Sequence, residues 1–192
     1  MLRILVALTV SGMSSAFAFE FSKLEVSAGI HGALLNFAHD EYAPTTAFAL
    51  SPILSTSYRF NRSQKVITSV SLASSSSSNE ELRFYESIFH VDVNLGYEHR
   101  VALSRSFDFW PTVQLVSGYS SFSDRYYLAQ DGYLDQVVED EKGVLSTGVL
   151  LGGTVTFSPF INSRIDFGLN GFYRLSFGSE LNTAALGVLV NY

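Results

Sequence analysis

Apolar and polar residues alternate with a period of two over several long stretches, and this alternation constrains the fold more than any other feature of the sequence. The clearest stretch is residues 83–103. Its apolar positions are Tyr85, Phe89, Val91, Val93, Leu95 and Tyr97, and its polar positions are Glu86, His90, Asp92, Asn94 and Glu98. A strand places alternate side chains on opposite faces, whereas a helix would need a period of about 3.6. The stretch therefore predicts a β-strand with one apolar and one polar face.

Similar alternation recurs along the chain and predicts eight strands. Their expected ranges are 22–36, 45–60, 65–74, 83–103, 107–121, 143–157, 163–177 and 183–192. The serine run at 74–78 and the segment 122–142, which shows no alternation, are expected to be loops. Pro52 lies inside the second strand and should cause a bulge or a local break, because proline has no N–H to donate to a neighbouring strand.

Residues 1–18 are expected to be a signal peptide that is removed on export. Arg3 precedes the apolar run at 4–10, and a small-residue cleavage site ending at Ala18 follows. That run is shorter than the roughly 20 residues that a transmembrane helix needs. The mature chain, residues 19–192, should then form a single β-barrel domain. Because the sequence has no cysteine, disulfides cannot hold it together.

Several features favour a membrane-spanning barrel over a soluble, lipocalin-like one. The predicted strands reach the length of about 9 to 11 residues that a spanning strand requires. Aromatic residues cluster near both ends of the strands, as they do at the two interfaces of a bilayer. The short turns are basic and the longer loops are acidic. The net charge of -6 argues against a nucleic-acid partner.

The chain ends on a strand, T-A-A-L-G-V-L-V-N-Y, whose alternation stops at an aromatic residue, Tyr192. With eight alternating strands and this closing strand, residues 19–192 resemble the small eight-stranded outer-membrane barrels of the OmpA and OmpX type. The resemblance implies an all-β, antiparallel, up-and-down transmembrane β-barrel in the outer membrane of a Gram-negative bacterium. It also implies contact with outer-membrane lipid and lipopolysaccharide, insertion by the barrel-assembly machinery through the strand ending at Tyr192, and a monomeric state.

Charged residues on the predicted inner faces form the first candidate site. They are Glu25, Glu86, His90, Asp92, Glu98, Arg164, Asp166 and Arg174. Side chains fill the interior of an eight-stranded barrel, and a buried charge must be paired or it costs several kcal/mol. The favoured interpretation is therefore a structural network that plugs a polar lumen. An ion path and a catalytic site are the alternatives.

An enzymatic function is the less favoured interpretation of these residues. Lipid A deacylases of this fold carry a His-x-Ser pair, and none of the four histidines in this sequence has a serine at the required place. We therefore expect no enzyme activity, no cofactor and no metal. An outer-membrane lipid-modifying enzyme and a soluble periplasmic carrier of a lipophilic ligand remain the alternative functions.

The second candidate site is the long acidic segment at 122–142. Its candidate residues are Asp124, Tyr126, Tyr127, Tyr133, Asp135, Glu139, Asp140 and Glu141. Aromatic side chains are enriched where proteins bind one another. The carboxylates could equally bind divalent cations that bridge lipopolysaccharide phosphates. The sequence thus predicts a barrel that acts through external loops, by surface interaction or adhesion, or that serves as a structural component of the membrane.

Overall fold

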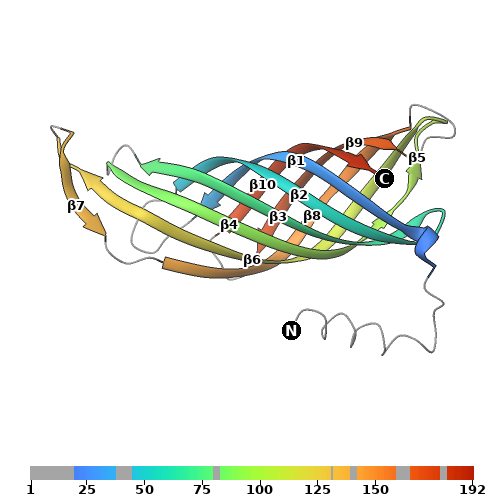
Figure 1. Cartoon of the computed structure of the whole chain (residues 1–192), viewed down its shortest axis with the longest axis horizontal. Helices are drawn as coiled ribbons and strands as arrows, with labels where there is room; N and C mark the ends of the chain where they lie inside the picture. The colour runs from blue at the N-terminus through green and yellow to red at the C-terminus, as the bar shows by residue number, and fades with distance from the viewer. Residues whose placement is uncertain are drawn as a thin grey trace.

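The computed structural model describes residues 20–37, 45–79, 83–130, 132–138, 142–158, 165–177 and 181–192 (Figure 1). The predicted signal peptide lies outside these residues. After a 3-10 turn at Phe21–Lys23, the strands are β1 (Leu24–Phe37), β2 (Thr45–Asn61), β3 (Gln64–Asn79), β4 (Phe84–His99), β5 (Val101–Ala102), β6 (Phe107–Leu128), β7 (Leu134–Val138), β8 (Lys142–Phe157), β9 (Asp166–Ser176) and β10 (Leu181–Asn191). Within the described ranges, no helix has the length and apolar character needed to cross a bilayer.

Eight of these strands form a closed ring. Hydrogen-bonded neighbours follow the order β4-β3-β2-β1-β10-β9-β8-β6, and β6 pairs with β4 to close the ring. All of the pairings are antiparallel, and the short strands β5 and β7 each pair with β6 outside the ring. Closure leaves no long strand edge without a backbone partner, which is a requirement for a sheet in lipid. The predicted eight-stranded, up-and-down barrel is confirmed.

The two ends of the barrel differ in their connections. The chain ends of β1, β3, β6 and β9 lie at the end that carries β7, which we call the loop end. The 3-10 turn, β5 and Tyr192 lie at the opposite end, which we call the turn end (Figure 1). Successive strands therefore run in opposite directions between the two ends, as the alternation of short turns and longer loops predicts.

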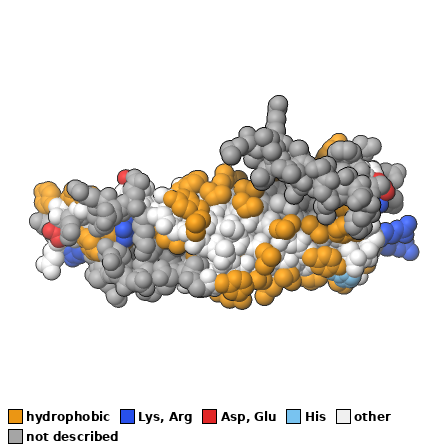
Figure 2. Space-filling view, turned by 90° about the horizontal axis from the view of Figure 1, so that it is seen from below, with side chains coloured by type: hydrophobic (Ala, Val, Ile, Leu, Met, Phe, Trp, Pro, Cys, Tyr) orange, Lys and Arg blue, Asp and Glu red, His pale blue; other side chains and the backbone are white. Residues whose placement is uncertain are grey.

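The outer wall of the barrel is apolar. Large hydrophobic side chains are exposed at alternate positions of the ring strands, among them Leu115 at 64% and Leu186 at 63%. They form patches along the surface in Figure 2, whereas the charged side chains visible there lie toward the two ends. The faces predicted for the fourth strand are correct, since Val93 is 49% exposed and Asp92 is 7% exposed. A wall of this kind suits contact with lipid acyl chains.

Aromatic side chains line the outer wall at both ends. Those exposed at the turn end include Phe60, Tyr97, Phe107, Phe157, Phe167 and Tyr192, and those exposed toward the loop end include Phe89, Tyr119, Tyr173 and Phe177. The rings of Phe107 and Phe157 stack with their centroids 4.9 Å apart. Aromatic rings with one apolar and one polar side are favoured at the two surfaces of a bilayer.

The serine run is a strand, so the prediction of a loop there is wrong. β3 continues through residues 74–78, and its register with β4 is unbroken from Gln64, opposite His99, to Asn79, opposite Phe84. Serine occupies both faces of this part of β3, so the sequence shows no contrast between alternate positions. The strand is specified instead by pairing with β4, whose own alternation is strong.

The segment at 122–142 also contains more strand than predicted. β6 extends to Leu128, and β7 folds back against it as a hairpin with Gly132 at its turn, in the left-handed region at a φ of 85°. Asp124 has a φ of 50°, and the register between β4 and β6 shifts between Tyr85 and Ser87. This β-bulge inserts an extra residue and exchanges the two faces of the strand beyond it. The alternation changes phase there, which hid the end of β6.

Pro52 breaks one ladder without shifting its register. It pairs with Ile30 of β1 inside an unbroken run of partners. On the other side, the pairing between β2 and β3 stops after Leu50, opposite Ser74, and resumes at Ile53, opposite Ser71. The register is the same before and after the gap. Of the two expected effects, a bulge or a local break, Pro52 therefore causes the local break. The break affects only the pairing with β3.

Candidate functional site

A buried cluster around Arg174 lies in the middle of the lumen. Arg174 on β9 donates to the Oδ1 of Asp92 at 2.5 Å and also to the Oγ of Ser146. The Nε2 of His90 lies 3.0 Å from the same Oδ1 of Asp92 and 3.2 Å from the Nη1 of Arg174. Gly118 leaves the necessary space, since a Cβ there would overlap the Asp92 carboxylate. The barrel thus brings predicted residues of β4 and β9 together.

In the same cluster, the side chain of a histidine lies between those of a serine and an aspartate and contacts both. The Oγ of Ser120 lies 2.8 Å from the Nδ1 of His90, whose other ring nitrogen faces Asp92. These are the residue types of a nucleophile, a base and an orienting carboxylate. However, Ser120 is buried, and Asp92 is engaged by Arg174. The two cavities described below lie nearer the turn end, and none of Ser120, His90 and Asp92 lines either of them. The geometry therefore favours a structural network.

A second ionic network lies at the turn end around the ring of Trp110. The Nζ of Lys65 lies 3.0 Å from Glu98 and 3.7 Å from Glu25, and it sits 4.3 Å from the centroid of the Trp110 ring. Arg59 pairs with Glu25, and its guanidinium carbon lies 5.3 Å from the same ring centroid. Cations over an aromatic face are attracted to its π-electrons. Arg59 lies on β2 and Lys65 on β3, within the ranges predicted for the second and third strands.

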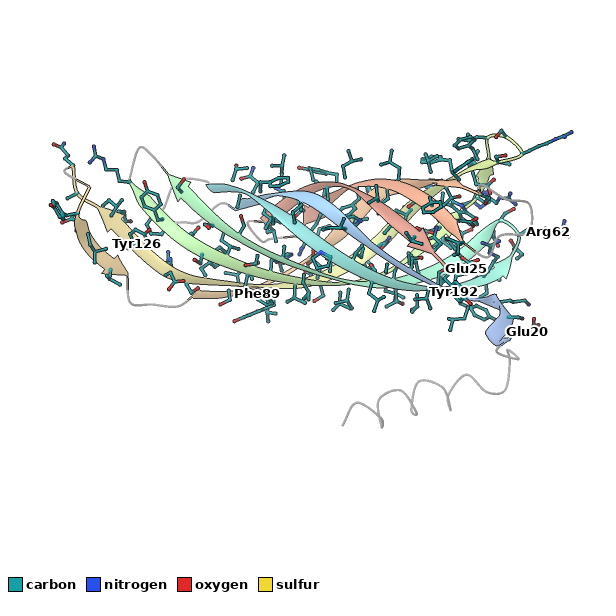
Figure 3. All side chains as sticks on the ribbon, turned by 45° about the horizontal axis from the view of Figure 1, so that its top comes forward. Glu20, Glu25, Arg62, Phe89, Tyr126 and Tyr192 are labelled. Carbon is teal, nitrogen blue, oxygen red and sulfur yellow. The ribbon has the colours of Figure 1, made fainter. Side chains whose placement is uncertain are left out.

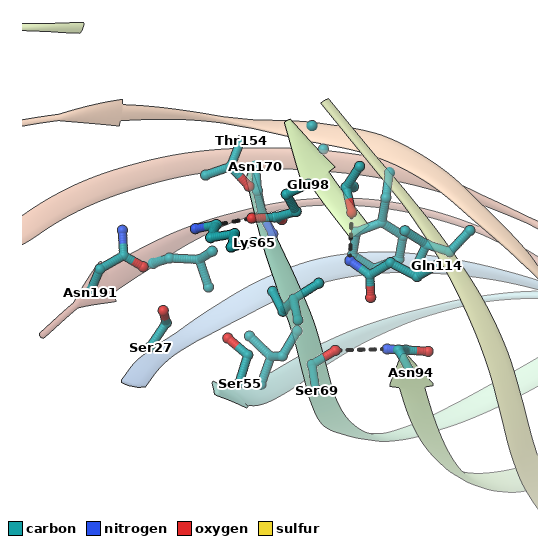
Figure 4. A pocket seen from close by; sticks show the side chains of 18 of the residues that line it. Ser27, Ser55, Lys65, Ser69, Asn94, Glu98, Gln114, Thr154, Asn170 and Asn191 are labelled. Carbon is teal, nitrogen blue, oxygen red and sulfur yellow. Dashed lines mark hydrogen bonds and ion pairs between the residues drawn. The ribbon is translucent and has the colours of Figure 1, made fainter. Parts of the chain in front are cut away.

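Polar cavities adjoin this network. One of about 260 Å³ is lined by Glu25, Arg59 and Lys65 of the network and by Arg100 and Asp108, which pair at 2.8 Å. A smaller one of about 40 Å³ lies deeper, where Lys65 and Glu98 meet Asn94 and Gln114 (Figure 4). The amide nitrogens of Asn94 and Gln114 donate to Ser69 and Thr112, both at 3.0 Å. Cavities with this lining have polar groups to bond water.

The predicted residue Asp166 lies at the rim of the larger cavity. Its Oδ1 accepts a hydrogen bond from the Oγ of Ser158 at 2.6 Å. Asp166 is therefore separate from the Arg174 cluster, although Asp166 and Arg174 both lie on β9. Arg164, which was predicted to face inward beside it, lies outside the described residues.

An apolar layer, which the sequence did not predict, lies in the loop half of the lumen. We call this layer the apolar plug, and its buried residues are Ala33, Leu35, Ala47, Ala49, Ala73, Ile88, Phe122, Leu181 and Ala185. Val144 and Phe172 pack against it. The signal was present in stretches such as A-F-A-L at 47–50, where inner and outer positions are both apolar. The buried side chains are thus polar in the turn half and in the middle of the lumen, whereas this layer of the loop half is apolar.

An ion pair lies near the loop end of the lumen. The Nε of Arg125 is 3.6 Å from the Oε2 of Glu86, and both side chains are buried. The guanidinium carbon of Arg125 also lies 5.5 Å from the centroid of the Phe84 ring. Glu86 was among the predicted lumen residues, but Arg125 was not. The bulge at Asp124 turns Arg125 inward, so simple alternation could not identify it.

The residues of the second predicted site do not form one loop. Tyr126 and Tyr127 belong to β6, where Tyr126 stacks on Tyr85 with ring centroids 5.3 Å apart and Tyr127 contacts Phe84 at 5.0 Å. Asp124 occupies the bulge. Tyr133 and Asp135 are exposed in the hairpin of β6 and β7. Glu139, Asp140 and Glu141 lie outside the described residues.

No protein-family model matches the chain, and no curated protein matches it. Solved structures do. Neisserial surface protein A has a TM-score of 0.56 at 12% identity, over 88% of this chain and 96% of that one. Ail, the attachment invasion locus protein of Yersinia pestis, which is an outer membrane protein, has a TM-score of 0.52 at 16% identity, over 88% of this chain and 97% of that one. The fold is therefore that of the small outer-membrane barrels.

Proposed function

We propose that this protein is an integral barrel of the outer membrane of a Gram-negative bacterium, and that it acts through its loop end at the cell surface without being an enzyme. The closed ring with its apolar outer wall supports the membrane location. The likeness to outer-membrane proteins supports the same location. We further propose a monomer that the barrel-assembly machinery inserts through β10, the strand ending beside Tyr192.

We propose that the lumen is closed to solutes. Between the turn end and the loop end, the lumen contains the polar cavities, the Arg174 cluster and the apolar plug. Beyond the plug, Glu86 and Arg125 form the buried pair near the loop end. An apolar layer is a barrier to ions, because they would lose their hydration there. The apolar plug is the observation that best supports closure.

A role at the cell surface is supported by the hairpin of β6 and β7. Tyr133, Leu134 and Val137 are exposed by 75%, 61% and 54% on β7 and the turn before it, outside the ring. Exposed aromatic and aliphatic side chains of this kind commonly anchor protein partners. Ail has been solved with a heparin analogue, sucrose octasulfate. A sulfated ligand of that kind fits this hairpin poorly, because its charged residues at 131–141 are acidic. We therefore propose a protein partner.

The test uses a variant in which Tyr133, Leu134 and Val137 become serine. Cells that express the protein should bind their surface partner, measured as adhesion to protein-coated surfaces or host cells, and this variant should lose that binding. A matched control replaces Val101 and Leu103, which are exposed at the turn end, with serine. The control should bind like the wild type.

Insertion has to be measured separately in the same cells. Heat-dependent mobility on gels and the amount of protein in the outer membrane should be equal for all forms. Adhesion that persists in the hairpin variant at full insertion would contradict the proposed role of the hairpin. Recovery of the wild type as a soluble periplasmic protein would contradict the membrane location.

A further inference from the structure

Nine residues of β3, β4 and β6 form an uncharged patch on the outer wall near the loop end, which we call the serine-aromatic patch. Each of its rows crosses the three strands in register. The rows are Ser74, Phe89 and Ser121, then Ser76, Ser87 and Ser123, then Ser78, Tyr85 and Tyr126. The stacked rings of Tyr85 and Tyr126 complete the row nearest the loop end. The patch therefore offers hydroxyl groups beside aromatic faces.

The patch faces sideways, away from the barrel axis. Its residues occupy the same face of their strands as Leu72 and Val93, which belong to the lipid-facing wall. The bulge at Asp124 keeps Tyr126 on this outer side by adding one residue to β6. Figure 3 places Phe89 nearer the middle of the barrel and Tyr126 nearer the loop end. A molecule that touches the whole patch must therefore lie beside the barrel and not above it.

The patch lies at the upper limit of the lipid-facing wall. The stretch from Tyr97, at the turn end, to Ser87 rises roughly 25 Å along the barrel axis, at about 3.3 Å per residue and a tilt of about 40°. The apolar band of an outer-membrane barrel is itself about 25 Å tall. The central row of the patch is therefore level with the headgroups of the surrounding lipid, and the row of Tyr85 stands slightly beyond them.

Hydroxyl groups are concentrated on this side of the barrel. Near the loop end of other described strands, Asn36 on β1 and Thr46 on β2 are polar and exposed, whereas Phe48 on β2 and Leu145 on β8 are apolar and exposed. On the patch, serine takes the place of such residues. The neighbouring Ser75 differs from the patch serines, because it points inward and its hydroxyl donates to the carbonyl of Phe48 at 2.5 Å. The outward serines Ser74, Ser76 and Ser78 are exposed.

We propose that the serine-aromatic patch binds the saccharide headgroup of a lipopolysaccharide molecule in the outer leaflet. This proposal rests on the loop end facing the cell surface, as proposed above. The serine hydroxyls can donate to and accept from sugar hydroxyls and phosphate oxygens. The tyrosine rings supply an apolar face with a polar rim at the level of the headgroup. A soluble glycan is the less suitable occupant, because the patch continues the lipid-facing wall and faces the space that membrane lipids fill.

The test compares purified full-length mature forms in zwitterionic detergent micelles, with fluorescent rough lipopolysaccharide as the probe and its anisotropy as the signal. The patch variant replaces Ser76, Ser87 and Ser123 with alanine. The matched control carries Thr56→Val, Thr68→Val and Ser117→Ala, which remove hydroxyls from exposed positions lower on the same wall. Three lost hydrogen bonds should weaken binding by about tenfold or more in the patch variant. The control should bind like the wild type.

A heat-dependent gel shift shows separately whether each form is a folded barrel. If the wild type shows no such shift, the result contradicts the membrane barrel that was proposed above. If a variant shows the normal shift but binds differently, the result concerns the patch alone. If the patch variant does not fold, Ser76→Ala and Ser87→Ala as single changes carry the test, each with an expected weakening of about threefold.

Equal affinities of the wild type, the folded patch variant and the control would overturn the proposal. Free core oligosaccharide, without its lipid, is the competitor that separates the two sources of saccharide. It should fail to displace the probe at millimolar concentration. Full displacement that depends on the patch residues would show that the site takes a soluble glycan, which would also overturn the proposal of a lipid contact.

Discussion

The two halves of the lumen solve the problem of filling a narrow barrel in different ways. The turn half contains charges in pairs, with Lys65 between Glu25 and Glu98, and polar cavities that adjoin them. The loop half contains small and large apolar side chains in contact, such as Leu35 and Phe122. The Arg174 cluster lies at the boundary of the two, and Phe172 both lines the small cavity and packs against the plug. The difference shows that a narrow lumen can be filled by paired charges beside cavities in one half and by packed apolar side chains in the other.

The largest effect is expected at the boundary between the halves. Replacing Arg174 with methionine leaves Asp92 buried beside only His90, and the loss of one partner of a buried ion pair costs about 3 to 5 kcal/mol. Urea unfolding in micelles measures this loss. The double variant Arg174→Met with Asp92→Leu should regain most of the stability, because it removes both charges. A double variant as unstable as the single one would show that the pair is not the source of the effect.

A change in the apolar plug should cost nearly as much. Phe122→Ala should lower the free energy of unfolding by about 3 to 5 kcal/mol, since it removes a buried aromatic ring and leaves a cavity. Replacing the polar Thr154, which lines the small cavity of the turn half, with the isosteric valine is the control. The two halves would not differ as described if the control lost as much stability as Phe122→Ala.

A smaller effect is expected in the ionic network of the turn half. Lys65→Met removes a partner of Glu98, but the adjoining cavity lets water take part of the place of the ammonium group. We expect a loss of about 1 to 3 kcal/mol, as for a polar group whose hydrogen-bond partner is removed. A loss as large as that of Arg174→Met would mean that the turn half is as dry as the middle of the lumen.

The smallest effect is expected on the polar wall of the lumen. Asn94→Ser replaces the amide with a hydroxyl that can bond within the small cavity, so its cost should be below about 1 kcal/mol. Its outward neighbour Val93 provides the contrast, because Val93→Arg should cost about 2 to 4 kcal/mol near the bilayer midplane. Equal costs in a refolding titration would contradict the assigned faces of β4.

The sequence predicted the strands wherever one face is apolar and the other polar. β4 is the best example, because Val93 and Asp92 differ so strongly in character. The prediction failed where that contrast is missing or changes phase. Serine on both faces hid the end of β3, and the bulge at Asp124 hid the end of β6 together with the inward position of Arg125. Such features depend on the partner strand, which a single stretch of sequence does not contain.

Most of the residues of the lumen network were also identifiable from alternation, but their partners were not. Arg174 meets Asp92 and His90, whereas Glu86 meets Arg125 and Glu98 meets Lys65. Which charges meet depends on the tilt and stagger of the closed sheet, which the period of the sequence does not specify. The apolar plug was missed for a related reason, because apolar residues on both faces of a strand give no sign of which one points inward.

Cysteine accessibility tests the division of the lumen most directly, and the chain has no cysteine of its own. Single cysteines would replace Ser27, which lines the small cavity of the turn half, and Ala49, which belongs to the apolar plug. A small charged thiol reagent, added to the folded barrel in micelles, should modify the cysteine at position 27 within minutes and leave the one at position 49 unmodified until the protein is unfolded. Rapid modification of both positions would contradict a lumen that is closed in its loop half.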